Sequence, residues 1–168
     1  VGTNEESGWG GIDYYMERAE KPSMGFAPDA DFPVIHAEMG ILIFDLIKKI
    51  KATNDSGIII KSITGGNAPN MVADAAKAII SAKDYEKIKE ALKLFNEENE
   101  DKVQSRMRGK SMEVSAVGIS AHGSTPQKGK NAISILMAFL GKLDIANDDL
   151  AEFVNFYNEK IGFQLNGE

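Results

Sequence analysis

The sequence predicts an α+β fold, because segments with helical and strand periodicity mix along the chain without strict alternation. A helix is predicted at residues 85–95, where four apolar side chains recur at spacings of three, four and three among Lys and Glu. A strand is predicted at residues 111–119, where apolar and polar residues alternate. A chain of 168 residues has room for one sizeable domain, or for one domain and part of another.

The first forty residues are rich in Gly, Pro and acidic residues. Residues 11–20 (GIDYYMERAE) are compatible with a short helix, whereas residues 27–33 (APDADFP) contain two prolines that forbid one. Residues 32–51 predict extended segments, because β-branched and aromatic residues are frequent and Gly40 interrupts them. We expect Trp9, the only tryptophan, to pack against the core.

Two segments in the middle of the chain could form strands. Residues 56–63 (SGIIIKSI) are a strand candidate. Residues 70–81 (NMVADAAKAIIS) are ambiguous, since four alanines favour a helix and period-two alternation favours a strand. On balance, the residues of this segment taken by themselves slightly favour a helix.

The last third of the chain predicts a loop and two helices. Residues 120–131 (SAHGSTPQKGKN) form a loop of turn residues. Residues 132–143 (AISILMAFLGKL) predict a buried helix, because they are broadly apolar. A final helix with an apolar stripe follows, and Asn147 or Asp148 is its expected N-cap.

The composition excludes several classes of function. A net charge of −6 argues against a nucleic-acid partner, and the basic spots at 106–110 and 128–130 are interpreted as solvated loops. The chain has no cysteine, which excludes disulfides and thiolate sites and fits a cytoplasmic location. The apolar runs are far shorter than the roughly 20 residues that span a bilayer, so no membrane partner is expected.

Acidic pairs are the first candidates for chemistry. Glu5 and Glu6 lie in a solvated acidic loop, or one of them holds a metal ion while its neighbour handles protons. Gly2 and Gly8 would allow the turn that brings both carboxylates to one site. A second pair, Asp29 with the aspartate two residues later, either ligates a metal or stabilises its loop.

Two further polar residues each allow two interpretations, and a third allows one. His122 has small neighbours, so its imidazole either polarises a substrate oxygen or is an ordinary surface group. Asn70, beyond the turn GGNAP, either binds a ligand or shapes the turn. His36 alternates with apolar positions and is interpreted as structural.

Four motifs occur in a fixed order along the chain: GTNEESGW, MGFAPDADFPVIHAEMG, NMVADAA and GISAHGSTPQKGKNA. Together they resemble the di-zinc dipeptidases of bacteria, the PepV-like branch of metallopeptidase family 20, whose relatives include aminoacylases and acetylornithine deacetylases. The sequence departs from that pattern at Asn4, where the family usually has aspartate, and at Ala73, where it has proline.

The resemblance implies roles for five residues. Glu5 would be the general base, and Glu6 and Asp29 would each ligate one of two zinc ions, or manganese or cobalt in their place. His122 would close over the substrate and stabilise the oxyanion, and Asn70 would contact the backbone or carboxylate of the substrate.

The resemblance also implies a domain organisation. Residues 1–38 would be a segment of the metal-binding catalytic domain, and residues 39–168 part of a lid domain with a β-sheet backed by helices. In the family, residues 70–81 correspond to a lid strand, so a strand is expected there despite the helical propensity.

We therefore expect a fragment of a zinc-dependent dipeptidase, whose partners are a dipeptide substrate and the remaining parts of its parent chain. Several family ligands have no counterpart here, so the chain alone should be inactive and bind zinc poorly. Two alternatives stay open. One is an N-acyl amino-acid deacylase of the same superfamily, and the other is a non-catalytic binding module on the same scaffold.

Overall fold

The structure, a computed structural model, describes residues 4–5, 8–25, 33, 35–37, 42–51 and 57–165. It divides into two compact units, Val1–Leu42 and Ile43–Glu168, and each is described by itself.

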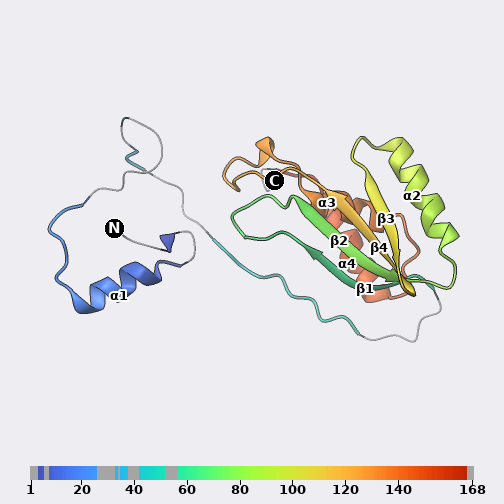
Figure 1. The fold of residues 1–168 in the computed structure, drawn as a ribbon, viewed down its shortest axis with the longest axis horizontal. Coiled ribbons are helices and arrows are strands. Elements are labelled where there is room, and N and C mark those ends of the chain that lie inside the picture. Colours follow the sequence, from blue (N-terminus) through green and yellow to red (C-terminus); the bar gives the residue numbers. More distant parts are fainter. Residues whose placement is uncertain are drawn as a thin grey trace. The chain divides into compact units, whose positions relative to one another are not determined.

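The N-terminal unit contains one helix among its described residues, α1 (Gly10–Arg18), which confirms the helix predicted there (Figure 1). The guanidinium of Arg18 stacks 4.0 Å from the ring centre of Tyr14, one turn earlier. Trp9 precedes the helix and is 52% exposed. The expectation that Trp9 packs against the core is therefore wrong.

The C-terminal unit is built on a four-stranded antiparallel sheet in the order β1-β2-β4-β3. Its elements are β1 (Ile59–Gly65), β2 (Ala75–Ser81), α2 (Glu86–Glu98), β3 (Val103–Arg108), β4 (Ser111–Val117), the short 3₁₀ helix η2 (Pro126–Lys128), α3 (Ala132–Leu140) and α4 (Asp148–Lys160). Figure 1 shows α3 and α4 behind the sheet. The predicted α+β fold, with a sheet backed by helices, is confirmed.

Alternation along the central strands directs one apolar face of the sheet to the helices. Ala78 and Ile80 of β2 and Val114 of β4 are fully buried on this face. The ring of Phe139 on α3 meets that of Phe95 on α2 edge-on, with 5.6 Å between centroids. Ala76 and Ala78 on β2 are small and buried, so α3 can pack closely on the sheet. Most residues of α3 are buried, as its broadly apolar sequence predicts.

Strand β2 settles the ambiguity of residues 70–81. The strand expected from the family resemblance is confirmed for Ala75–Ser81, and the leaning towards a helix is wrong. Residues 70–74 lie outside the strand. β2 hydrogen-bonds to β1 on one side and β4 on the other. This pairing and the burial of alternate residues outweigh the helical propensity of alanine.

Strand β3 is an element that the sequence analysis missed. It forms a hairpin with β4 through Gly109 and Lys110, and Gly109 has a φ of +60°. The interpretation of residues 106–110 as a solvated loop is wrong, because Arg106 and Arg108 lie on β3 and pair with Glu113 of β4.

Residues 42–51, part of the segment predicted as extended, lie in no strand and in no helix. Its end is held against the start of α4. The Lys51 N–H donates to Asp149 Oδ2 at 3.0 Å, and Asn147 Nδ2 donates to the Lys51 carbonyl at 2.8 Å. Asn147 also accepts from the Leu150 N–H at 3.0 Å, which confirms the predicted N-cap.

Candidate functional site

The loop between β4 and α3 carries His122 and lies against the loop that precedes β2. The Val72 N–H donates to the Ala121 carbonyl at 2.8 Å, and the Gly123 N–H donates to the Asn70 carbonyl at 2.6 Å. The structure therefore brings together His122 and Asn70, two of the residues predicted from the sequence. They are adjacent because β2 and β4, to which the loops connect, are neighbours in the sheet.

Glycines allow this close approach. A Cβ atom on Gly123 would lie 3.0 Å from the Asn70 carbonyl oxygen, and one on Gly118 would lie 2.0 Å from the Lys130 carbonyl oxygen. Both neighbours are backbone atoms, which cannot rotate away as a side chain can. At the base of the loop, Ile119 and Lys130 exchange backbone hydrogen bonds of 2.9 and 2.8 Å. The path of the loop is thus fixed by its backbone.

The imidazole of His122 is exposed and is contacted through one nitrogen. Nδ1 lies 3.2 Å from the Ser124 backbone nitrogen, which donates to it, and 2.8 Å from Ser124 Oγ. Ser124 was not among the predicted site residues. A serine two residues after a loop histidine is a signal for such a local side-chain to backbone turn.

Two pairs of polar side chains lie close to this loop, one at its base and one on the helices that follow it. Lys130 forms an ion pair of 2.5 Å with Asp101, and this hydrogen bond and charge raise the pKa of Lys130. Lys130 is therefore not part of a purely solvated loop. On α3, the buried Ser134 lies 3.1 Å from the hydroxyl of Tyr157, whose pKa is raised by burial.

Glu5 lies in a tight turn of the N-terminal unit. The Trp9 N–H donates to the Asn4 carbonyl at 2.8 Å. Asn4 and Trp9 have φ values of 64° and 62°, in the left-handed region that non-glycine residues seldom occupy. Asparagine visits this region more readily than other non-glycine residues, whereas for Trp9 the conformation costs about 1–3 kcal/mol. The side chain of Glu5 is exposed.

The predicted metal ligands, Glu6 and Asp29, lie outside the described residues. Within the described ranges no group of three or more His, Asp or Glu side chains could hold a metal ion. These residues therefore provide no donor set that fits zinc. In the same part of the chain, no helix has both the length and the apolar character needed to cross a membrane.

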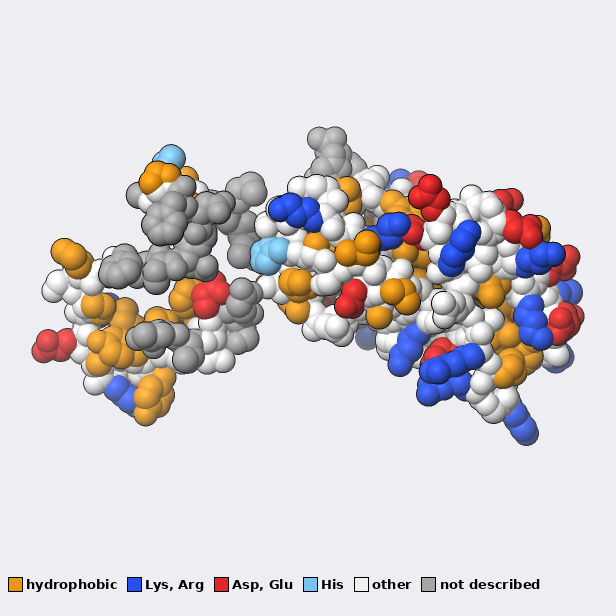
Figure 2. Space-filling model, turned by 45° about the horizontal axis from the view of Figure 1, so that its top comes forward, with side chains coloured by type: hydrophobic (Ala, Val, Ile, Leu, Met, Phe, Trp, Pro, Cys, Tyr) orange, Lys and Arg blue, Asp and Glu red, His pale blue; other side chains and the backbone are white. Residues whose placement is uncertain are grey.

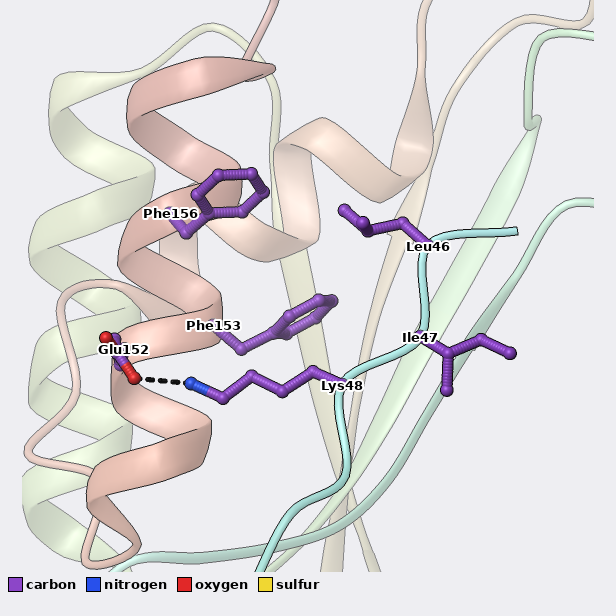
Figure 3. Close-up of a pocket in the computed structure, with 6 residues that line it drawn as sticks. All are labelled: Leu46, Ile47, Lys48, Glu152, Phe153 and Phe156. Atoms are coloured by element: carbon purple, nitrogen blue, oxygen red, sulfur yellow. Dashed lines mark hydrogen bonds and ion pairs between the residues drawn. The ribbon is translucent and has the colours of Figure 1, made fainter. Parts of the chain in front are cut away.

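A hollow of about 230 Å³ lies between residues 46–48 and α4 (Figure 3). Phe153, Phe156 and Leu46 line it, and the ion pair of Lys48 with Glu152 crosses one end. None of its lining residues comes from the loops of Asn70 and His122. The two charged residues of this hollow pair with each other and its other walls are apolar, so it provides no side chain positioned for hydrolysis.

The face of the C-terminal unit that is visible in Figure 2 does not show one dominant charge. Figure 2 shows basic, acidic and hydrophobic side chains interspersed on the visible face of this unit. The loops of Asn70 and His122 are therefore distinguished by the hydrogen bonds that join them, and not by the charge of the surface around them.

Comparison with known proteins finds one matching family model and several similar dipeptidases. Residues 104–166 match the peptidase dimerisation domain of the M20 peptidases. The chain is 33% identical over 170 residues to the "Beta-Ala-Xaa dipeptidase" of Lactobacillus delbrueckii subsp. lactis, covering 96% of this chain and 36% of that protein. It is 32% identical over 169 residues to "Putative dipeptidase YtjP" of Bacillus subtilis (strain 168), covering 100% of this chain and 36% of that protein. The chain thus spans about a third of the length of these relatives.

Proposed function

We propose that this chain, whose resemblance to the M20 dipeptidases is confirmed along nearly its whole length, acts as part of a longer enzyme that hydrolyses dipeptides. The observation that carries the proposal is the 2.6 Å hydrogen bond from Gly123 to Asn70. It joins two of the family-like motifs into one surface and leaves the His122 imidazole exposed beside it.

His122 and Asn70 have complementary tasks in this proposal. An N–H of the imidazole donates to the carbonyl oxygen of the scissile bond as that oxygen gains negative charge. One preorganised donor of this kind contributes about 3–4 kcal/mol to the stabilisation of a transition state. Asn70 binds the backbone or the carboxylate of the dipeptide, which orients the bond under attack.

Glu5 is proposed as the general base. Its carboxylate is exposed, so it can reach a water molecule, and the left-handed residues around it hold it in a defined turn. Glu6 and Asp29 are proposed as ligands of two zinc ions, with manganese or cobalt as alternatives. A zinc ion held by them would lower the pKa of a bound water to about 7.

The isolated chain is proposed to be inactive and to bind zinc poorly. Catalytic zinc sites use three protein ligands and an open position, and the chain's candidate carboxylates do not supply that number for two ions. Calorimetric titration of the chain with zinc should therefore give weak binding. A submicromolar affinity would contradict this expectation.

The test of function uses the full-length enzyme, assayed with a dipeptide, a β-alanyl dipeptide and an N-acyl amino acid. His122→Ala should lower kcat by about 10²–10³-fold with a small change in KM, because it removes a donor used in the transition state. Glu5→Gln should also lower kcat. Lys128→Ala, in the same loop, is the matched control and should be unaffected.

Retention of kcat by His122→Ala would refute the proposed role of the loop. Preference for the N-acyl amino acid over both dipeptides would identify the enzyme as a deacylase. A full-length protein that hydrolyses none of these substrates would favour a binding module.

A further inference from the structure

We propose that Ser124 is a positioning residue that fixes both the tautomer and the orientation of the His122 imidazole, so that Nε2 carries the hydrogen. Its significance for catalysis rests on the proposed function, in which His122 donates to an oxyanion. The tautomer itself can be measured without any activity.

The assignment of the tautomer follows from a donor that cannot act as an acceptor. The Ser124 backbone N–H points at His122 Nδ1 from 3.2 Å, so Nδ1 must present its lone pair there. The Ser124 hydroxyl, 2.8 Å from the same nitrogen, then donates to it as well. A neutral imidazole whose Nδ1 accepts carries its hydrogen on Nε2.

The backbone around Ser124 is itself restrained, so the direction of its N–H is set. The preceding residue, Gly123, donates to the Asn70 carbonyl at 2.6 Å, and the following residue, Thr125, donates to the His122 carbonyl at 2.9 Å. Ser124 therefore lies between two residues whose positions are fixed by hydrogen bonds. The contact of Ser124 with the imidazole is therefore set by the backbone of the loop and not by the side chain alone.

The tautomer decides whether His122 can do its proposed work. An oxyanion needs an N–H donor, and the Nε2–H tautomer presents one on the nitrogen that Ser124 leaves unoccupied. The opposite tautomer would present the Nε2 lone pair, which repels negative charge. By holding Nδ1, Ser124 thus sets the sign of the interaction as well as the direction of the ring.

The experiment is nitrogen-15 NMR of the 168-residue chain with labelled histidine, recorded at mildly alkaline pH. Long-range correlations from the ring protons identify which nitrogen carries the hydrogen. His122 should show a single Nε2–H tautomer. His36, the other histidine and an exposed one, is the internal reference for an imidazole without this restraint and should show both tautomers in exchange.

Two variants separate the hydroxyl from other effects of the loop. Ser124→Ala keeps the backbone N–H and loses only the hydroxyl, so it should raise the Nδ1–H fraction of His122 part of the way towards that of His36. Ser124→Thr, which keeps both donors, should preserve the original spectrum. Circular dichroism checks that both variants remain folded. A predominant Nδ1–H tautomer in the unsubstituted chain, or identical spectra for the chain and Ser124→Ala, would overturn the proposal.

The full-length enzyme distinguishes this inference from the proposed function. Ser124→Ala should lower kcat more than it changes KM, and Ser124→Thr should restore kcat. A fixed Nε2–H tautomer in an enzyme whose His122→Ala variant is fully active would refute the proposed function alone. An essential His122 that samples both tautomers would refute the role of Ser124 alone.

Discussion

Glu113 is a charged group buried within a β-sheet, and its two partners allow a quantitative test of the fold. Its side chain is 6% exposed, and its two oxygens lie 2.6 Å from Arg106 Nη2 and 2.9 Å from Arg108 Nη1. The arginine side chains are themselves 67% and 55% exposed. We predict the effect of replacing each arginine by alanine, alone and together.

Loss of one arginine should be mild and loss of both should be severe. With one arginine present the carboxylate stays paired, so each single variant should cost about 0.2–1 kcal/mol, as for exposed ion pairs. The double variant leaves the carboxylate without a counter-charge. Because the arginine side chains that cover it are lost as well, water reaches it, and the cost stays below the roughly 3–5 kcal/mol of a fully buried unpaired charge. The double loss should still exceed the sum of the single losses by about 0.5–3 kcal/mol, because the two arginines share one partner.

Urea unfolding followed by circular dichroism measures these free energies, and an unchanged m-value shows that the unfolding transition is comparable. Lys77→Ala, an exposed change on the neighbouring strand β2, is the control and should stay within about 0.5 kcal/mol. Replacing Glu113 by Gln in the double variant should recover stability, since no charge is then buried. Additive losses, or no recovery with glutamine, would refute the reasoning.

Three other predictions concern pH, the loop and the core. The pKa values of Tyr157 and Lys130 are raised in the folded chain, so the stability they contribute is present below their unfolded values of 10.0 and 10.5 and is lost as pH rises through the raised values. Thermal melts should show this alkaline loss, and Tyr157→Phe should reduce it; an equal loss in that variant would contradict the assignment. Gly123→Ala should cost about 1–3 kcal/mol in urea unfolding and speed amide exchange at residue 123, whereas Gly109→Ala, on an open turn, should leave that exchange unchanged. Phe139→Ala should lower the free energy of unfolding by about 3–5 kcal/mol, and a loss below 1 kcal/mol would exclude Phe139 as a core residue.

The elements that depend on local sequence were predicted well. The amphipathic spacing of α2, the broadly apolar character of α3 and the Asn147 cap of α4 are each contained in a few neighbouring residues. β2 is different, because its alanines favour a helix and only pairing with β1 and β4 makes it a strand. Its identity came from the family resemblance.

β3 and Trp9 show where sequence reasoning failed. The basic residues of β3 are typical of a solvated loop when the sequence is considered alone. In the structure, Glu113 on the next strand pairs with both arginines. Trp9 was expected in the core on its apolar character alone, yet it begins a helix in a separate small unit. For β3 the missing information is the partner on the next strand, and for Trp9 it is the division of the chain into two units.

The candidate site was predicted in its residues more than in its arrangement. The motifs named Asn70 and His122, but the hydrogen bond that joins their loops depends on the order of strands in the sheet. Ser124 was missed because its role is visible only once its N–H is seen to point at the ring. The contribution of Glu5 stays a prediction, as do those of Glu6 and Asp29.

The glycine-pinned loop divides its residues into two sets with different freedom to change. Backbone hydrogen bonds and close contacts at Gly118 and Gly123 set its path, so the exposed side chains of Gln127 and Lys128 carry no part of that shape. Substitutions at these two positions can accumulate without displacing the imidazole. A lineage can thus alter the exposed rim of the loop while inheriting an unchanged path of its backbone.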